Sequence, residues 1–304
     1  VAAEPEPMEY VRVCDAFGTG YFYIPGTETC LKIGGEVRAT VAFDDDGDWE
    51  SEVRARVAFE AKNDSEIGTI GSYIRVQATQ DADPSREAVV LDQAYITVGG
   101  FKVGRAYGFI DDFDGPGESD MFYTTTRFNL ASYTYSSDAF SVGLGVDDLS
   151  DFYLDNQVGI EATATATFGA VSAALFATYD IEAEEGTVSG YVAAEVGPGT
   201  AYLMGAYSSG VSAYTNPVDD LTAEWGVGAA YSFKATDKLT LTAQGMYYGD
   251  VNFVDDLDAW AADVLVEYKL AEGLKASADV MYIDTDAAGD DGAWGGFVRL
   301  TRSF

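Results

Sequence analysis

The residues of this chain that could act electrostatically fall into two sets of opposite charge. The basic set consists of four arginines, Arg38, Arg54, Arg56 and Arg75. The acidic set lies in one later segment, residues 108–125, and consists of Asp111, Asp112, Asp114, Glu118 and Asp120. If the two sets faced each other across water, their field would orient dipolar solutes, and rings of fixed charge would bias which ions pass. We therefore treat both sets as candidate pore-lining residues.

Catalysis by the common side-chain constellations is excluded because the chain has 0 histidines. A Ser-His-Asp triad, a His-assisted nucleophile and the usual imidazole metal sites therefore cannot form. Paired carboxylates such as Asp255 and Asp256 lie in an acid-rich segment and are better interpreted as solvated loop residues. We expect no enzymatic activity and no cofactor.

Alternating polarity is clearest over residues 50–62. One parity of this segment is mostly apolar and includes Val53, Val57 and Phe59, whereas the other carries glutamates, arginines and a lysine. Successive side chains on a strand point to opposite faces. One face could contact hydrocarbon, but the charged face needs water, which the core of an ordinary β-sandwich would not supply. The pattern predicts a strand between lipid and a wet interior.

Turn signals divide the whole chain into strands. Eight acid-rich segments are expected to be the outer connections: 44–49, 80–86, 108–125, 147–155, 182–186, 209–222, 250–258 and 284–293. Seven shorter breaks are expected to be the tight turns: 63–67, 99–100, 137–138, 168–169, 197–199, 235–237 and 271–273. Fifteen connections join sixteen strands, an even number that closes an up-and-down barrel. The third outer connection, 108–125, is the longest and is the candidate constriction.

The chain has no apolar run of the roughly 18 residues that a transmembrane helix requires. A closed barrel is the remaining way to cross a bilayer, because an open sheet would leave edge amides unpaired in lipid. The fold class predicted is therefore all-β, a single antiparallel transmembrane β-barrel of sixteen strands. We expect the barrel to occupy residues 32–304 and a separate N-terminal segment to occupy residues 1–31.

Hairpin arithmetic tests whether the arginines meet. If Phe43 pairs near Ser51, Arg38 lies opposite Arg56. If Lys62 pairs near Thr69, Arg56 lies opposite Arg75. Adjacent guanidinium groups repel one another, so we expect the carboxylates of the third outer connection to lie opposite them.

The formal net charge is −34, which argues against a nucleic-acid partner and favours small cations near the pore. Acidic outer loops could bind Ca²⁺ or Mg²⁺ loosely, and a secreted calcium-binding β-sandwich adhesin is the alternative interpretation. Residues 44–55 begin like a calcium loop with Asp44, Asp46 and Asp48, but Trp49 replaces its glycine and Ala55 its final glutamate. We predict no dedicated metal site.

Two cysteines, Cys14 and Cys30, bracket an aromatic segment near the start. The first residues contain no initiator Met, as expected for a chain exported after signal-peptide removal. In an oxidising compartment the two thiols would form a disulfide, and two unpaired buried thiols are the alternative.

Residues 9–31, EYVRVCDAFGTGYFYIPGTETCL, resemble the N-terminal signature of alphaproteobacterial general porins of the Rhizobium and Brucella group. Residues 94–104 (AYITVGGFKVG) and 293–304 (AWGGFVRLTRSF) are similar to segments of the same family. The resemblance implies a homotrimer of sixteen-stranded barrels in the bacterial outer membrane, each with a third loop folded into its pore. Its partners would be outer-membrane lipid, lipopolysaccharide and small hydrophilic solutes. The terminal Phe304 resembles the signal read by the barrel-assembly machinery.

Overall fold

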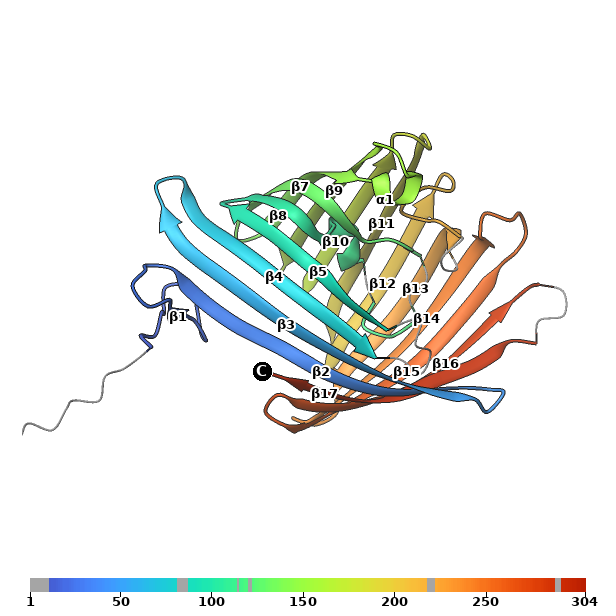
Figure 1. Ribbon diagram of the computed structural model, residues 1–304. Coiled ribbons are helices and arrows are strands. Elements are labelled where there is room, and N and C mark those ends of the chain that lie inside the picture. Colours follow the sequence, from blue (N-terminus) through green and yellow to red (C-terminus); the bar gives the residue numbers. More distant parts are fainter. Residues whose placement is uncertain (1–10, 81–86, 114, 120–121, 218–221, 288–290) are drawn as a thin grey trace, which may run out of the picture.

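Antiparallel strands make up most of the computed structural model, which describes residues 11–80, 87–113, 115–119, 122–217, 222–287 and 291–304 (Figure 1). The strands in chain order are β1 (Phe22–Tyr23), β2 (Cys30–Asp44), β3 (Trp49–Ser65), β4 (Gly68–Gln80), β5 (Ala88–Val98), β6 (Phe101–Tyr107), β7 (Arg127–Ser136), β8 (Phe140–Asp148), β9 (Val158–Phe168), β10 (Val171–Asp180), β11 (Glu185–Val196), β12 (Gly199–Ser208), β13 (Ala223–Lys234), β14 (Leu239–Val251), β15 (Ala259–Ala271), β16 (Leu274–Thr285) and β17 (Ala293–Ser303). Two short helical segments, η2 (Phe109–Asp112) and α1 (Ser150–Tyr153), lie in connections.

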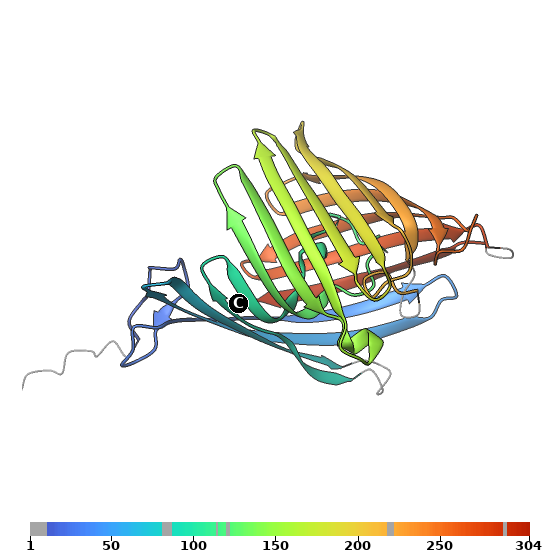
Figure 2. The same ribbon diagram turned by 90° about the horizontal axis from the view of Figure 1, so that it is seen from above.

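The strands β2 to β17 form one closed ring. Each pairs antiparallel with the next, and the last closes on the first through pairs such as Val298 with Val41. Figure 2 shows the C-terminal strands, in red, beside the N-terminal strands, in blue. The short strand β1 pairs with the start of β2, and its Phe22 also forms an isolated bridge with Val13. The predicted barrel of sixteen strands is confirmed, and closure into a single ring excludes the two-sheet sandwich of an adhesin.

The helical segments in the described ranges are both four residues long. No helix found there is long and apolar enough to cross a membrane.

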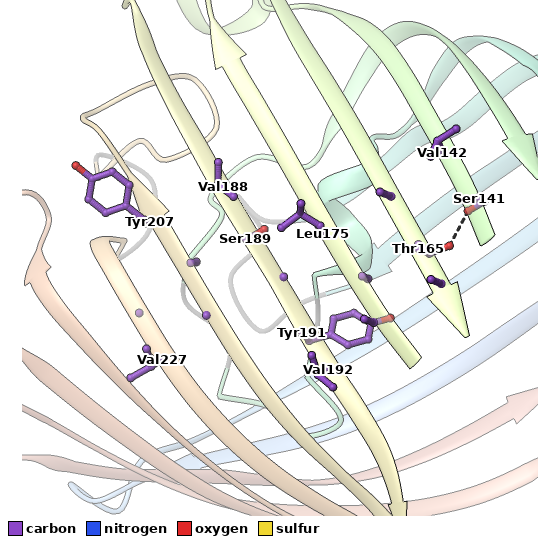
Figure 3. Close-up of a pocket in the computed structure, with 18 of the residues that line it drawn as sticks. Ser141, Val142, Thr165, Leu175, Val188, Ser189, Tyr191, Val192, Tyr207 and Val227 are labelled. Carbon is purple, nitrogen blue, oxygen red and sulfur yellow. Dashed lines mark hydrogen bonds between the residues drawn. The ribbon is translucent and has the colours of Figure 1, made fainter. Parts of the chain in front are cut away.

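The outer face of the barrel is apolar, as the alternation predicts. On β3, Val53 and Phe59 are about two-fifths exposed at this surface, while Arg54 and Arg56 of the other parity point inward and are half-buried. On the opposite side, Leu175, Val188 and Val227 line an outward groove of about 860 Å³ over strands β8 to β13 (Figure 3). The groove exists because small residues alternate with these larger ones along the outward parity. Such a surface is suited to contact with hydrocarbon.

The observed registers differ from the predicted ones by two residues. Phe43 pairs with Trp49, which places Arg38 opposite Arg54 rather than opposite Arg56. Lys62 pairs with Gly71, which places Arg75 opposite Ala58. Both predicted registers are therefore wrong. Because each slip is an even number of residues, every side chain keeps its predicted face.

Turn geometry explains these register differences. Between β2 and β3 only residues 45–48 are unpaired, and the turn contains Gly47 at φ +83°. The backbone N–H of Asp48 donates to the Asp44 carboxylate at 2.9 Å, which tightens this turn. Between β3 and β4 only residues 66–67 are unpaired, and Gly68 takes φ +107°, a conformation that favours glycine. Each strand therefore continues further into the predicted break than its composition indicates.

The N-terminal segment is attached to the barrel by the predicted disulfide, Cys14–Cys30, which is confirmed with a Cα–Cα distance of 5.9 Å. Both cysteines are buried together with Tyr21. The Nζ of Lys32 and the Nζ of Lys62 lie 5.7 and 5.5 Å from the Tyr21 ring centroid, so cation–π contacts add to the covalent link. Cys30 is also the first residue of β2. The division between residues 31 and 32 stays a prediction.

Candidate functional site: the inward face of the barrel

The predicted arginines gather on one side of the inward face. Arg38 lies on β2, Arg54 and Arg56 on β3, and Arg75 on β4. Two further arginines that the sequence analysis missed join them, namely Arg127 at the start of β7 and Arg299 on β17. We call these six residues the basic wall.

Glu36 lies in the middle of the basic wall and compensates part of its charge. Its Oε1 lies 2.9 Å from Nη2 of Arg54, 3.8 Å from Nη1 of Arg56 and 4.0 Å from Nη2 of Arg38. The first contact is a charge-assisted hydrogen bond. We expected the counter-charge in the third outer connection, but the nearest counter-charge to these three arginines is on the wall itself. The signal was present, because Glu36 has the same parity as Arg38 on one strand.

Asp92 is the second carboxylate that the sequence analysis missed. It is fully buried, and it accepts hydrogen bonds from Nε of Arg75 and from Nη1 of Arg127. A β-bulge places it there: Arg75 pairs with Gln93 and Val76 with Leu91, so Asp92 has no partner on β4. A bulge turns the extra residue away from its usual alternation. Alternation counted back from the exposed Ile96 would place Asp92 on the outer face, and the bulge reverses this assignment.

The third outer connection runs from residue 108 to residue 126, one residue beyond the predicted segment, and several of its contacts lie across the ring from β6. The backbone N–H of Gly117 donates to Oε1 of Gln244 on β14 at 3.1 Å. The backbone N–H groups of Glu118 and Ser119 donate to the Asp263 carboxylate on β15 at 3.1 and 3.0 Å. Gln244 and Asp263 are buried side chains of the inward parity. In the ring of sixteen, β14 is eight strands away from β6, where this connection begins.

The predicted acids of this connection have different surroundings. Glu118 lies nearest the basic wall, with its Oε1 3.6 Å from Nη1 of Arg299. Asp111 and Asp112 lie in η2, where Asp111 accepts a hydrogen bond from Oγ1 of Thr126 at 2.7 Å. Asp114 and Asp120 fall outside the described residues. Within the described ranges, the ion pair between Glu118 and Arg299 is the one contact of a predicted acid with the basic wall.

Burial among the neighbouring elements raises the pKa of both Asp111 and Asp112. The hydrogen bond from Thr126 opposes this effect at Asp111, and Lys102 opposes it at Asp112. Both side chains are nevertheless exposed to water. The rise in their pKa values therefore comes from protein atoms packed around η2 and not from complete burial of the carboxylates. Asp111 and Asp112 therefore take up protons at a higher pH than ordinary aspartates do.

Five buried carboxyl groups face inward from β8, β9, β10, β15 and β16, strands that carry no member of the basic wall. They are Asp147, Glu161, Asp180, Asp263 and Asp279, and we call them the acidic wall. In the described part of the chain, the first four of these acids accept hydrogen bonds from backbone N–H groups and hydroxyls rather than from cations. None of the five was predicted to face the interior: Asp147 was assigned to the acid-rich segment 147–155, and the other four are single acids on the polar parity of their strands.

Connections 149–157 and 209–222 pack on this acidic wall. Asp180 accepts hydrogen bonds from the hydroxyl of Tyr153 at 2.6 Å and from the backbone N–H of Ala213 at 2.9 Å. The hydroxyl of Tyr214 donates to Oδ2 of Asp147 at 2.7 Å. Burial, reinforced by the neighbouring carboxylates, raises the pKa of Tyr153 and Tyr214. Both phenols therefore stay neutral donors.

No metal site is assembled by the described residues, which contain no group of three or more His, Cys, Asp or Glu side chains able to hold an ion. Loose binding of Ca²⁺ or Mg²⁺ at the outer loops stays a prediction.

At the other end of the barrel, Phe304 exchanges backbone hydrogen bonds with Gly35 and leaves its ring exposed on the outer surface.

Comparison with known proteins follows the same architecture. A family model described as the porin subfamily matches residues 1–296. The chain is 41% identical over 321 residues to the putative outer membrane protein y4fJ of Sinorhizobium fredii, covering 100% of this chain and 92% of that protein. It is 39% identical over 331 residues to outer membrane protein IIIA of Rhizobium leguminosarum bv. viciae, covering 100% of this chain and 88% of that protein.

A solved structure supports the fold at lower identity. OmpT of Vibrio cholerae, in its trimer form, matches with a TM-score of 0.67 and 16% sequence identity, covering 91% of this chain and 100% of that chain. At this identity the likeness concerns the barrel alone.

Proposed function

The chain belongs to the porin subfamily, and from this premise we propose that it forms a general diffusion pore for ions and small hydrophilic solutes. It is a passive channel of the bacterial outer membrane and not an enzyme. The observation that carries the proposal is the inward face, where fixed charges of both signs surround the interior of a ring whose outer face is apolar. Such an interior is stable only when it is hydrated.

The third outer connection is proposed to fold inward and to narrow this pore. Its support is the set of hydrogen bonds from Gly117, Glu118 and Ser119 to Gln244 and Asp263, on strands opposite its own. Its residue Glu118 also contacts Arg299 of the basic wall. The constriction would be lined by Arg38, Arg54, Arg56 and Arg75 on one side and by Asp111, Asp112, Asp114, Glu118 and Asp120 on the other.

The pore is proposed to prefer small cations weakly. The net charge of −34 favours cations at the mouths, and this attraction falls as salt screens the charge. At the basic wall, Glu36 and Asp92 offset part of the positive charge. These two carboxylates therefore lower the electrostatic barrier that the arginines present to cations. A lower barrier is consistent with a modest preference for cations.

We propose that three copies of the chain associate, as in the trimer form of the Vibrio cholerae protein. Outer-membrane lipid and lipopolysaccharide would contact the apolar outer face, and Phe304 would be read by the barrel-assembly machinery. Divalent ions would bridge acidic outer loops to lipopolysaccharide phosphates. Chelation should then lower the thermal stability of the protein in lipopolysaccharide-containing membranes, and an unchanged stability would exclude this bridge.

The function is tested by planar-bilayer recording under a salt gradient. We compare the wild type with a variant in which Arg38, Arg54, Arg56 and Arg75 are all changed to Gln. A matched control changes to Gln four cations at strand ends or in an adjoining turn, namely Lys234, Lys238, Lys269 and Arg302. The basic-wall variant should shift the reversal potential toward stronger cation preference and alter the single-channel current, more than the control does. Unchanged current and reversal potential would show that the basic wall does not line the ion path.

A further inference from the structure

Two members of the acidic wall, Asp147 on β8 and Glu161 on β9, lie next to each other inside the barrel. Asp147 pairs with Gly159 and Gly145 pairs with Glu161, so the two side chains are diagonal neighbours on the inward face. Such neighbours are about 7–8 Å apart between Cα atoms, within reach of long side chains. Each residue is only 1% exposed. Two acids are therefore buried side by side.

Each of the two carboxyl groups has one satisfied oxygen and one unsatisfied oxygen. Oδ2 of Asp147 accepts a hydrogen bond from the Tyr214 hydroxyl at 2.7 Å, and Oε2 of Glu161 accepts one from the backbone N–H of Phe109 at 2.6 Å. The remaining atoms, Oδ1 of Asp147 and Oε1 of Glu161, are buried and have no hydrogen-bond partner. Phe109 is the first residue of η2, so Glu161 fixes the start of the third outer connection.

The position of Glu161 is closely defined by two glycines. A Cβ atom on Gly108 would lie 2.5 Å from Oε2 of Glu161, and one on Gly145 would lie 3.0 Å from its Oε1. The carboxyl group thus occupies the space that two side chains would otherwise fill. Glu161 is therefore packed in a defined position and is not a solvated surface acid.

The charged groups around the pair do not neutralise it. Lys102 on β6 is the cation that influences Glu161, but the described residues form no ion pair between them, and Asp112 of η2 adds a negative charge. On the other side, Tyr214 faces Asp147, and Asp180 on β10 lies near that tyrosine. The unpartnered oxygens of both groups are buried. Because no cation of the described residues pairs with either carboxyl group, a bound proton is the counter-charge that we consider.

We propose that Asp147 and Glu161 together bind one proton in the folded barrel and that this proton keeps the start of the third outer connection attached to the wall. With it, the pair carries one negative charge, and Phe109 and Tyr214 both donate to it. Without it, two buried like charges repel each other, and desolvation of both is unfavourable. The side chains then separate, water enters, and the anchor at Phe109 weakens. This inference rests on the proposed function, because it regulates the constriction of that pore.

The proton is tested directly by infrared difference spectroscopy of the folded full-length protein in detergent. At about pH 7 the wild type should show the carbonyl-stretch band of a buried protonated carboxyl group, sensitive to exchange into D₂O. Glu161→Gln and Asp147→Asn should each remove or shift this band. Glu195→Gln, which neutralises an exposed inward acid of β11, should leave it unchanged. A band unaffected by both pair variants would overturn the proposal.

The attachment of the third outer connection at Phe109, which we call the latch, is tested by single-channel recording between about pH 6 and about pH 10. Wild type and Glu195→Gln should show a rise in current fluctuations toward alkaline pH, and Glu161→Gln should show the quiet behaviour at every pH, since its amide is always neutral and its oxygen still accepts from Phe109. Asp147→Asn provides a second neutral variant, and heat-modifiable electrophoretic mobility confirms folding. Absence of a pH effect in wild type would overturn the latch while a conducting pore still supports the proposed function. Current fluctuations induced by EDTA at neutral pH would assign the counter-charge to a metal ion. They would overturn the proposal that the pair binds a proton.

Discussion

The two sides of the pore interior neutralise buried charge in different ways. On the basic wall, Glu36 and Asp92 form ion pairs with arginines of adjacent strands, so the wall is compensated by its own residues. On the acidic wall, Asp180 and Asp263 are satisfied mainly by backbone N–H groups of the connections that pack on them. The difference teaches that charge in the basic wall is balanced by ion pairs within the wall, whereas charge in the acidic wall holds the connections in place.

Removing the buried counter-charge of the basic wall should have the largest effect. Asp92→Asn leaves Arg75 and Arg127 without their shared carboxylate, and loss of one partner of a buried ion pair costs about 3 kcal/mol. The free energy of unfolding in urea and detergent should fall by that amount. Asp151→Asn is the control, because Asp151 pairs with Arg105 while 83% exposed, and it should change stability by less than about 1 kcal/mol. Equal losses in both variants would contradict the role given to Asp92.

Removing an anchor of the acidic wall should have the next largest effect. Asp263→Ala deletes the acceptor of two backbone N–H groups and of the Ser119 hydroxyl, a loss of about 1–3 kcal/mol for groups left buried and unpaired. The tip of the third outer connection should detach, and single-channel recording should show a larger and noisier current. Glu267→Gln, on the same strand but paired with Lys275, should leave the current steady. A steady current in Asp263→Ala would show that this contact does not hold the connection.

Glu36→Gln should sharpen the contrast with a smaller effect on stability. The variant uncovers the positive charge of Arg54, Arg56 and Arg38, whose mutual repulsion amounts to a few tenths of a kcal/mol per pair. We expect the reversal potential under a salt gradient to move toward anions, with unfolding stability lowered by less than about 1 kcal/mol. A shift toward cations would mean that Glu36 does not compensate the arginines that face the ion path.

The smallest effect concerns the acids that do not belong to either wall. Because the pKa values of Asp111 and Asp112 are raised, both acids take up protons at a higher pH than ordinary surface aspartates as the solution is acidified. The ionised forms are disfavoured in the folded chain, so protonation does not destabilise it; instead the pore loses negative charge. Cation preference should therefore begin to fall in mildly acidic solution. The double variant Asp111→Asn with Asp112→Asn should remove this early part of the titration of reversal potential, and an unchanged titration would contradict it.

The sequence contains enough information for the strands and their faces, because lipid on one side and water on the other impose a period of two on every strand. Val53 and Arg54 show this directly. It contains less information about register, since the slips at Phe43 and at Lys62 preserve every face and depend on how tightly a glycine turn closes.

The site was only partly predictable for a related reason. Four arginines of the basic wall could be assigned from parity, but the position of Asp92 depends on a bulge that no periodic pattern reveals. The acidic wall depends on contacts between strands and connections far apart in the chain, such as Ser119 with Asp263. Composition marked the connection as acidic, whereas its observed anchors are mostly its backbone amides.

The seam between β17 and β2 has a consequence for biogenesis. Residues 303 and 36 pair across it. The backbone groups of both edge strands therefore stay unpaired until the C-terminal strand has been synthesised. An incomplete sheet would expose two unpaired edge strands, which can pair with the edge strands of another chain. Closure between such distant partners is intrinsically slow. The newly made chain must therefore be protected from aggregation with other copies until β17 pairs with β2.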